Sequence, residues 1–503
     1  MWADYSNHRT LVTLTGLVRL HLSIRRCPHK DCSRYRRPYR PEAEGALALP
    51  HHEFGLDVIA LIGALRYAEH KSVPEIHRAL RERGVDIAQR SVTSLLERYD
   101  ELLALSLSDA DRLREITARE ERVILALDGL QPDVGHEVLW VLRDCLSGEV
   151  LLAKSLLSSA AEDLAALLGA VASVLPVPIE GVVSDGQRSI RRAVERALPG
   201  VPHQLCHYHY LREAALPIYE ADRHAKKVLK KYVRGIRVIE RKVEPREDKE
   251  ADVVRGYCAA ARSALTDDGP PPLSASGLRL HERLTAIQDS LERVEKRGPL
   301  PKPLAKLKAL VAKGLDKTRD LWPDVRVAFP WIHSAARILN NAEKLDAPKV
   351  ERRLQALLDV MARDREKAGA LAPAVDRFLK VSRSYWPGLF HCYSVKGLPR
   401  TNNDLEQFFG SSRHHERRAT GRKGAPPGLV LRGSVRLVAG AATRLRSRSG
   451  AELQPRDPAR WKQLRQQLNA RCRIRRRGLH FRRDPKAYLG NLEEQLGKLA
   501  LPS

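Results

Sequence analysis

Two short apolar runs, each ending in an aspartate, constrain this 503-residue chain more than any other feature. The first run is Val123–Asp128 and the second is Gly181–Asp185, and a glycine follows each aspartate. Short apolar runs bounded by turn residues are typical of buried strands. Because sites in open α/β sheets form beyond the carboxyl ends of the strands, we expect Asp128 and Asp185 to lie close together.

The chain around these runs alternates between strand-like and helix-like patterns. Asp144–Gly148 has the glycine that a hairpin turn needs, and β-like runs flank it. The expected elements are strands at 123–128, 137–142, 150–157, 181–184 and 201–206, and helices at 162–175 and 187–198. An antiparallel trio followed by helix, strand, helix and strand matches an RNase H-like fold, in which acids meet at adjacent strand ends.

Two carboxylates held side by side repel each other unless a cation lies between them. Hard oxygen ligands of this kind suit Mg²⁺ or Mn²⁺. Two such ions can activate a water or a 3′-OH and stabilise the leaving oxygen at a phosphodiester. Asp128 and Asp185 therefore predict a metal-dependent site that processes DNA, although Asp-Gly pairs also occur in plain turns. Asp133 and Asp144 are rival acids for the first position.

A third acid is expected from a helix far downstream, which begins near Thr401. Thr401 can cap this helix, and residues three or four positions apart share one helical face. Asn402, Asn403 and Glu406 could then project together, with Glu406 as the third metal ligand. The alternative is a capping box, in which the acid only binds backbone amides, and Asp404 is the nearest rival. The apolar face of the helix would consist of Leu405, Phe408 and Phe409.

The segment after Glu406 is basic and rich in small residues. It could clamp the phosphates of DNA that enters the site, and a solvated charged loop is the alternative. The candidate DNA-binding residues are Arg413, Arg417, Arg418, Arg422 and Lys423.

The formal net charge of +27 and the isoelectric point near 10.0 are extreme for a globular enzyme. A large polyanion is the expected partner, because neutralising phosphates releases counterions. Seven cysteines are too few for a disulfide scaffold and favour a reducing, cytoplasmic and nucleoid-associated location. The sequence shows no signal peptide pattern and no apolar window long enough for a membrane span.

Residues 1–52 predict a basic, zinc-finger-like segment. Leu11–Ile24 alternates loosely and can form a strand. Cys27 and Cys32 follow in a C-x4-C motif that could hold a structural Zn²⁺, but zinc needs about four ligands. The candidates to complete the set are His29, His51 and His52. The alternative is a basic arm with two incidental thiols.

Residues 53–105 read as three helices, at 55–67, 72–83 and 88–105. A capping serine opens the second helix, and Gly84 ends it. Helix, short turn, helix is the outline of a helix-turn-helix DNA-binding domain, and a plain three-helix packing unit is the alternative. The polar residues that could reach a DNA groove from the start of the last helix are Gln89, Arg90, Ser91 and Thr93.

The remaining chain is largely helical and basic. Residues 214–385 contain no strand-like run, and Asp267–Gly277 is the clearest flexible break within them. Residues 386–450 return to mixed character, and residues 451–503 predict a basic helical tail.

Cys206 and His209 form a C-x2-H motif directly after the last expected strand. From the residues alone, a metal or structural hydrogen-bonding role and simple packing are equally open. A Cys/His nucleophile pair lacks an orienting third group.

In order along the chain, the blocks Leu-Ala-Leu-Asp128-Gly, Val-Ser-Asp185-Gly, Cys206-His-Tyr-His209 and Thr-Asn-Asn-Asp-Leu-Glu406 resemble those of Mutator-like DDE transposases and related bacterial insertion-sequence transposases. The resemblance covers residues 118–213 and 395–425. It implies an RNase H-like core, interrupted by a large all-helical insertion before the helix that carries the glutamate. Glu406 follows Asp185 by 221 residues, which leaves room for such an insertion.

The resemblance also implies an N-terminal zinc or helix-turn-helix module that binds terminal repeats, and a structural role for Cys206 and His209. The incomplete cysteine set departs from a full zinc ribbon. The expected domains are 1–52, 53–105, a core at 118–213 and 386–450, an insertion at 214–385 and a tail at 451–503.

We therefore expect a transposase in which Asp128, Asp185 and Glu406 hold two Mg²⁺ ions for strand cleavage and transfer. Its partners would be terminal inverted repeats, target DNA and further copies of itself, since two ends must be joined. The alternatives are an RNase H-fold nuclease without strand transfer and a domesticated, non-catalytic DNA-binding protein.

Overall fold

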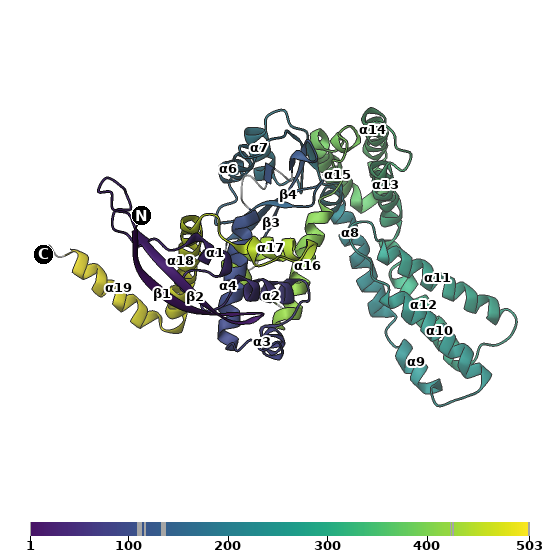
Figure 1. Cartoon of the computed structure of the whole chain (residues 1–503). Coiled ribbons are helices and arrows are strands. Elements are labelled where there is room, and N and C mark those ends of the chain that lie inside the picture. The colour runs from purple at the N-terminus through teal and green to yellow at the C-terminus, as the bar shows by residue number, and fades with distance from the viewer. Residues whose placement is uncertain are drawn as a thin grey trace. The chain divides into compact units, whose positions relative to one another are not determined.

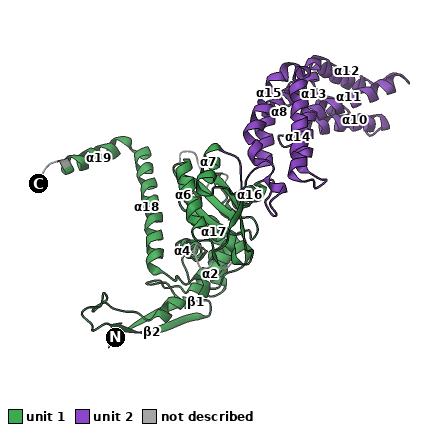
Figure 2. Ribbon diagram, turned by 90° about the horizontal axis from the view of Figure 1, so that it is seen from above, with its two compact units in different colours: residues 1–182, 188–201, 402–503 green, residues 183–187, 202–401 purple. Residues whose placement is uncertain are grey.

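The computed structural model describes residues 2–107, 113–114, 117–131, 137–422, 424 and 427–500 (Figure 1). These residues form a mixed α/β, mostly helical structure with a five-stranded sheet and a two-stranded sheet. The chain divides into two compact units (Figure 2). The first unit contains residues 1–182, 188–201 and 402–503, and the second contains 183–187 and 202–401.

The five-stranded sheet is built from the strands that the apolar runs predict. Its members are β3 (Val123–Leu130), β4 (Val138–Asp144), β5 (Val150–Leu156), β6 (Ile179–Ser184) and β7 (His203–Leu205). Their order across the sheet is β5-β4-β3-β6-β7, and β4 is antiparallel to both β3 and β5. The expected strands are confirmed, with small shifts at their ends.

Asp128 lies inside β3 rather than at its end, which corrects the expected strand boundary. The strand continues to Leu130, because Gly129 and Leu130 still pair with β4. Leu130 is buried, so the extension covers apolar surface, whereas Asp128 is only half-buried. The Asp128 side chain therefore projects from the strand two residues before its end.

In the first unit, helices cover both faces of the sheet, as the ribbon shows around β3 and β4 (Figure 1). One face packs on α6 (Ala161–Ala172) and α7 (Arg188–Ala197) through aliphatic residues such as Val123, Leu125 and Leu127. The residues between them on β3, Ile124 and Ala126, are also buried and point to the opposite face. On that side lies α17 (Pro427–Leu445), which packs against β5.

The three predicted N-terminal helices are confirmed as α2 (Leu56–Tyr67), α3 (Val73–Glu82) and α4 (Gln89–Leu107). Ser72 and Glu75 form a reciprocal capping box at the start of α3. Gly84 follows α3 with a φ of 79°, a left-handed conformation that favours glycine.

The first 52 residues differ from their expectation. Leu11–Ile24 is not a single strand but spans the turn between β1 (Trp2–Thr13) and β2 (Gly16–Arg26). Gly16 has a φ of 116°, and the Thr13 hydroxyl donates to its carbonyl at 2.8 Å. This turn divides Leu11–Ile24 between two strands, although the alternation of apolar and polar residues shows no break there. A short helix, α1 (Glu42–Leu47), follows.

The C-terminal region is helical throughout its described residues. It contains α16 (Asn403–Thr420), α17, α18 (Pro458–Arg483) and α19 (Pro485–Ala500). No strand occurs among the described residues of 386–450, so the expected mixed character there is wrong. The predicted basic helical tail is confirmed as helix.

The second unit contains β7 and a series of helices, as predicted for 214–385. They are α8 (His207–Tyr232), α9 (Ile236–Val243), α10 (Lys249–Thr266), α11 (Ser276–Glu295), α12 (Lys302–Lys317), α13 (Pro323–Asn340), α14 (Ala347–Arg363) and α15 (Ala372–Tyr385). Helix α8 contributes to two hydrophobic cores. Its first half packs with α13, α14 and α15, and its second half packs with α9 to α12.

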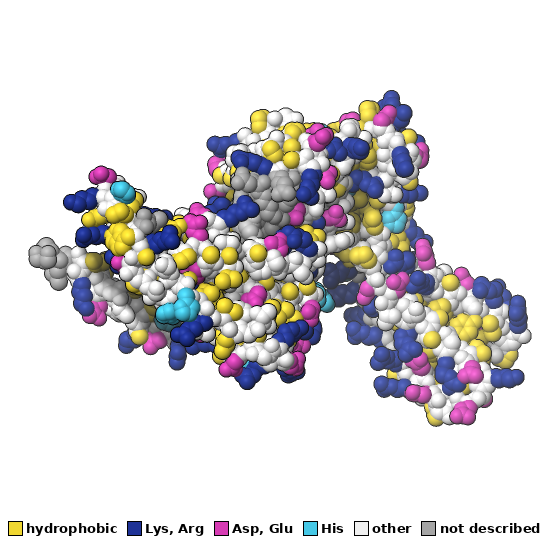
Figure 3. Space-filling view, viewed as in Figure 1, with side chains coloured by type: hydrophobic (Ala, Val, Ile, Leu, Met, Phe, Trp, Pro, Cys, Tyr) yellow, Lys and Arg dark blue, Asp and Glu magenta, His cyan; other side chains and the backbone are white. Residues whose placement is uncertain are grey.

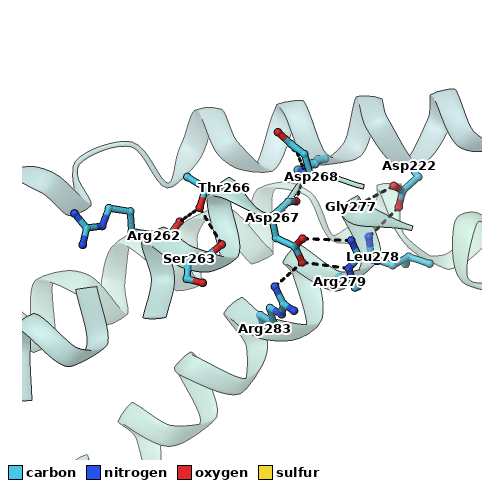
Figure 4. A network of polar contacts seen from close by, with 11 residues as sticks. Asp222, Arg262, Ser263, Thr266, Asp267, Asp268, Gly277, Leu278, Arg279 and Arg283 are labelled. Atoms are coloured by element: carbon cyan, nitrogen blue, oxygen red, sulfur yellow. Dashed lines mark hydrogen bonds and ion pairs between the residues drawn. The ribbon is translucent and has the colours of Figure 1, made fainter. Parts of the chain in front are cut away.

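The segment Asp267–Gly277 separates α10 from α11 as expected, but polar contacts tie it down (Figure 4). The buried Asp222 carboxylate of α8 accepts hydrogen bonds from the Gly277 and Leu278 amides at 2.7 and 2.8 Å. These amides open α11, so a negative charge caps its positive end. The Asp267 carboxylate accepts from the Arg283 guanidinium at 2.6 Å.

A cluster of buried charges joins α2, α4, α16 and α17 in the first unit. The Asp100 carboxylate accepts from the Tyr67 hydroxyl at 2.5 Å and lies 3.6 Å from Arg436. The Glu416 carboxylate lies 3.6 Å from Arg66 and 3.8 Å from Arg436. All of these side chains are largely removed from solvent, so each charge depends on its partners.

A second group of buried charges surrounds Glu101, which has no exposed surface. Its carboxylate lies 3.0 Å from Arg98 and 2.8 Å from Arg432 of α17. It also accepts a hydrogen bond of 3.0 Å from the Trp461 indole of α18. One carboxylate therefore connects three helices.

Within the described residues, no helix has the apolar length that crossing a lipid bilayer requires.

We expect Glu101→Ala to lower the free energy of unfolding by about 3–5 kcal/mol, because it leaves two buried guanidiniums without this carboxylate. The matched control is Glu343→Ala, since Glu343 pairs with Arg353 at 2.7 Å but is 62% exposed. The control should cost about 0–1 kcal/mol. Denaturant unfolding measures both changes, and equal losses would contradict the role given to burial.

The His415 side chain on α16 should make stability depend on pH. Burial, together with nearby Arg66 and His70, lowers the pKa of His415 to about 3. Between roughly pH 6.5 and 3 the unfolded chain binds a proton at His415 that the folded chain does not, so stability falls as pH falls. We expect His415→Gln to reduce this loss when unfolding is measured at about pH 7 and 5. Replacement of the exposed neighbour His414 by Gln should leave the wild-type pH dependence unchanged.

Candidate functional site

The start of α16 docks against β3 beside Asp128. The buried Asn402 side chain donates a hydrogen bond of 3.4 Å from Nδ2 to the Leu127 carbonyl. Asn402, rather than Thr401, is the residue that precedes the helix. Glu406 lies one helical turn further along and is half-buried. The structure therefore brings the helix of Glu406 to the strand of Asp128, although 278 residues separate these acids.

The N-terminus of α16 shows no side-chain capping hydrogen bond, so the described structure does not form the capping box that was the alternative role for its acids. The predicted apolar face is confirmed, because Leu405 and Phe409 are buried. Phe408 is half-buried, with the guanidiniums of Arg143 and Arg444 at 5.9 and 6.0 Å from its ring centre. These cation–π contacts hold the helix between β4 and α17.

The acids that were alternatives to Asp128 and Glu406 lie in different surroundings. Asp144 is buried, and its carboxylate accepts hydrogen bonds from the backbone of Ile124 at 3.1 Å and Ser147 at 2.8 Å. It therefore builds the turn after β4. Asp404 is exposed on the outer side of α16, and Asp133 lies outside the described residues.

Asp185 belongs to the second unit and follows β6 directly. Its carboxylate accepts from the Gln187 amide at 2.9 Å, and its carbonyl accepts from the Tyr385 hydroxyl at 3.3 Å. The same hydroxyl contacts Glu213 of α8 at 2.9 Å. Helices α8 and α15 thus fix the backbone that carries Asp185.

Gly186 allows this arrangement for two reasons. Its φ is 85°, in the left-handed region that disfavours other residues. A Cβ atom at this position would also lie 2.8 Å from the Tyr385 ring. The Asp-Gly pair is therefore required by the approach of a buried tyrosine. Sequence reasoning missed Tyr385, because nothing in its local pattern distinguishes it from a core residue.

Cys206 and His209 lie at the start of α8. Cys206 is fully buried, precedes the helix and donates its amide to the Ser184 carbonyl at 2.8 Å, which joins β6 to β7. His209 is half-buried in the first turn. Between them, His207 is buried and its Nε2 lies 2.7 Å from the Leu389 carbonyl. His207 therefore has a structural role in this motif, which the sequence analysis did not predict.

The donor chemistry of the proposed acids suits a hard cation, since carboxylate oxygens are the ligands that Mg²⁺ prefers. Within the part of the chain that the structure describes, no group of three or more His, Cys, Asp or Glu side chains is arranged to hold a metal ion. The Asp128 carboxylate accepts from the Gly129 amide at 2.7 Å, as the Asp185 carboxylate does from Gln187. Each aspartate carboxylate thus accepts a hydrogen bond from a backbone amide one or two residues further along the chain.

Cys27 and Cys32 lie in one turn after β2. The Arg34 amide donates to the Cys32 sulfur at 3.4 Å, and this bond, followed by the nearby Cys27 thiol, lowers the pKa of Cys32. The described residues supply no third or fourth ligand beside them. The turn therefore presents half of a tetrahedral zinc set.

The candidate DNA-binding residues lie mainly on exposed surface. Gln89, Arg90 and Thr93 are exposed at the start of α4, and Ser91 is half-buried. The basic segment after Glu406 forms the remainder of α16 rather than a loop, with Arg413, Arg417 and Arg418 on its outer side and Arg422 just beyond it. Arg418 pairs with Glu75 of α3 at 3.1 Å. Lys423 lies outside the described residues.

Comparison with protein-family models and with curated proteins finds no match to this chain.

We expect Gly186→Ala to disturb the turn of Asp185 more than a left-handed φ alone explains. The control Gly200→Ala has a φ of 80°, and no atom lies within 4 Å of the position that its new Cβ would take, so it should cost about 1–2 kcal/mol. Gly186→Ala should cost about 1–3 kcal/mol more, because it also meets Tyr385. It should further speed hydrogen exchange of the Gln187 amide. Equal behaviour of the two variants would contradict the close approach of Tyr385.

Proposed function

We propose that this protein is a DDE transposase that cleaves the ends of an insertion sequence and transfers them to target DNA. Its catalytic core would be RNase H-like, interrupted by the helices of the second unit. Asp128, Asp185 and Glu406 would be its catalytic carboxylates. The observation that supports the proposal is the docking of α16 on β3, because it brings the helix of the half-buried Glu406 to the strand that carries Asp128.

The strand order supports the RNase H-like core. In the five-stranded sheet, β3, β4 and β5 form an antiparallel trio. The next strand along the chain, β6, lies beside β3 in the order β5-β4-β3-β6-β7. Asp128 is carried by β3, and Asp185 follows β6. In the proposed enzyme these neighbouring strands deliver the first two acids.

Mg²⁺ or Mn²⁺ would be held by the three carboxylates and would supply Lewis acidity at the scissile phosphate. In the cleavage step, water attacks phosphorus and the bond to the 3′ oxygen breaks, which leaves a 3′-OH and a 5′-phosphate. In the transfer step, that 3′-OH attacks a target phosphodiester and releases a target 3′-OH. The number of phosphodiester bonds is conserved in the second step, so it needs no external energy source.

The basic surfaces support DNA as the partner. The start of α4 presents three exposed polar or basic residues after a helix and a glycine turn, as a recognition helix would. The formal charge of +27 favours a polyanion. Two transposon ends must be held together, so we propose that the active form contains at least two copies of the chain.

The test uses purified full-length protein, DNA carrying the inverted repeats that flank its gene, a supercoiled target plasmid and Mg²⁺. We expect joined products in the wild type, and a loss of at least about a hundredfold in Asp128→Asn, Asp185→Asn and Glu406→Gln, because each removes a metal ligand. Asp404→Asn is the matched control on the exposed side of the same helix and should stay within about twofold.

Three other outcomes would contradict the proposed function or one of its assignments. Cleavage without joined products would favour a nuclease on the same fold. Specific binding without any cleavage would favour a non-catalytic DNA-binding protein. Full activity of Asp185→Asn would overturn the assignment of the second acid.

A further inference from the structure

Helix α8 carries cations on two different sides in its second half. Lys226 is buried, and its ammonium contacts the Asp267 carbonyl at 2.7 Å and the Asp268 carboxylate. Arg223, Lys227 and Lys231 are exposed. The inward cation thus has an acidic partner, and the three outward cations form a separate set.

The outward cations form a straight row on the helix surface. Arg223, Lys227 and Lys231 are four residues apart, so they are stacked at steps of about 6 Å on one face. Ala225, Leu229 and Val233 have the same spacing but are displaced by two residues, and they are buried in the core with α9 to α12. Two residues correspond to about 200° of rotation, so the row lies opposite the core.

Three more exposed cations follow this row along the chain and extend it to six. Arg234 lies in the turn after α8, and Arg237 and Arg241 lie on α9. Lys and Arg side chains are frequent over the region where these helices lie (Figure 3). Among the described residues, none of the six cations of this row has an ion pair.

Three other exposed arginines of the second unit have acidic partners. Arg319, Arg353 and Arg363 each lie within 3.1 Å of an acidic oxygen, on Asp316, Glu343 and Asp364 respectively. Like charges four residues apart weaken a helix by about 0.2–0.5 kcal/mol per pair, whereas an acid at the same spacing would strengthen it. The row therefore costs local stability unless an anion covers it.

We propose that the outer face of α8, continued by α9, is a second DNA-binding surface that holds the phosphate backbone without reading sequence. Cations at steps of about 6 Å can each approach a phosphate of one strand, because the strand carries a phosphate about every 3.4 Å along the axis. The inference rests on the proposed function for its choice of polyanion, but it concerns binding rather than catalysis.

The test measures binding of the full-length protein to fluorescent duplexes of about 40 base pairs and two unrelated sequences, by anisotropy at several salt concentrations. The variant carries Arg223→Gln, Lys227→Gln and Lys231→Gln. We expect affinity to fall at least about tenfold for both sequences, and the slope of log affinity against log salt to decrease by about 2.7, or roughly 0.9 per lost phosphate contact.

The matched control carries Arg319→Gln, Arg353→Gln and Arg363→Gln in the same unit. It removes the same charge from exposed arginines that already have acidic partners, so its affinity should stay within about twofold of the wild type. The α8 variant should keep or gain helix stability by circular dichroism, because it removes like-charge pairs.

Equal losses in the two variants would overturn the proposal, because total charge rather than the row would then govern binding. Unchanged DNA affinity in the α8 variant would also overturn the proposal. So would an α8 variant that no longer binds phosphatidylserine vesicles but still binds DNA as the wild type does, because the row would then serve a membrane. If the wild type binds duplex through this row but never cleaves or joins DNA, the proposed function fails while the surface stands.

Discussion

The buried charge cluster between α2, α4, α16 and α17 is the interaction on which the first unit depends most. Asp100, Glu416, Arg66 and Arg436 are removed from water, where isolated charges would be very costly. Burial alone raises the pKa of Asp100 to about 6 despite its cationic neighbours. These groups are compensated only when all four helices are in place. Hydrophobic contact is tolerant of small shifts, whereas charges at these distances need one arrangement.

The same cluster explains how a distant helix can be held at a site. At its far end α16 is fixed by Glu416, and at its near end by Asn402 on β3. Glu406 lies between these anchors, so they help to fix its position. In the second unit, Asp185 is positioned in a related way, because the Tyr385 hydroxyl contacts both its carbonyl and the Glu213 carboxylate of α8. The supporting residues thus lie in or next to helices, whereas Asp128 lies in a strand and Asp185 directly follows one.

Much of this fold was predictable, because its signals are local. The apolar runs predicted the five strands, and the Ser72–Glu75 pair with Gly84 predicted the bounds of α3. Of the candidate site, the helix that carries Glu406 was predictable from its local pattern, since it was expected near Thr401 and begins at Asn403. The remainder depends on long-range contacts. Glu416 meets Arg66 across 350 residues, and no local pattern distinguishes such a glutamate from a surface acid.

The basic residues of this chain include buried, paired arginines and exposed cations without an acidic partner among the described residues, and the sequence alone does not distinguish these two groups. In the first unit, arginines such as Arg66, Arg432 and Arg436 are buried and matched by carboxylates, so they serve the fold. On α8, one lysine is paired inward while the neighbouring cations form an exposed row without acidic partners among the described residues. Net charge alone therefore overstates how much of the surface can attract a polyanion. The exposed cations of α8 could meet a phosphate backbone without displacing an ion pair that holds the fold.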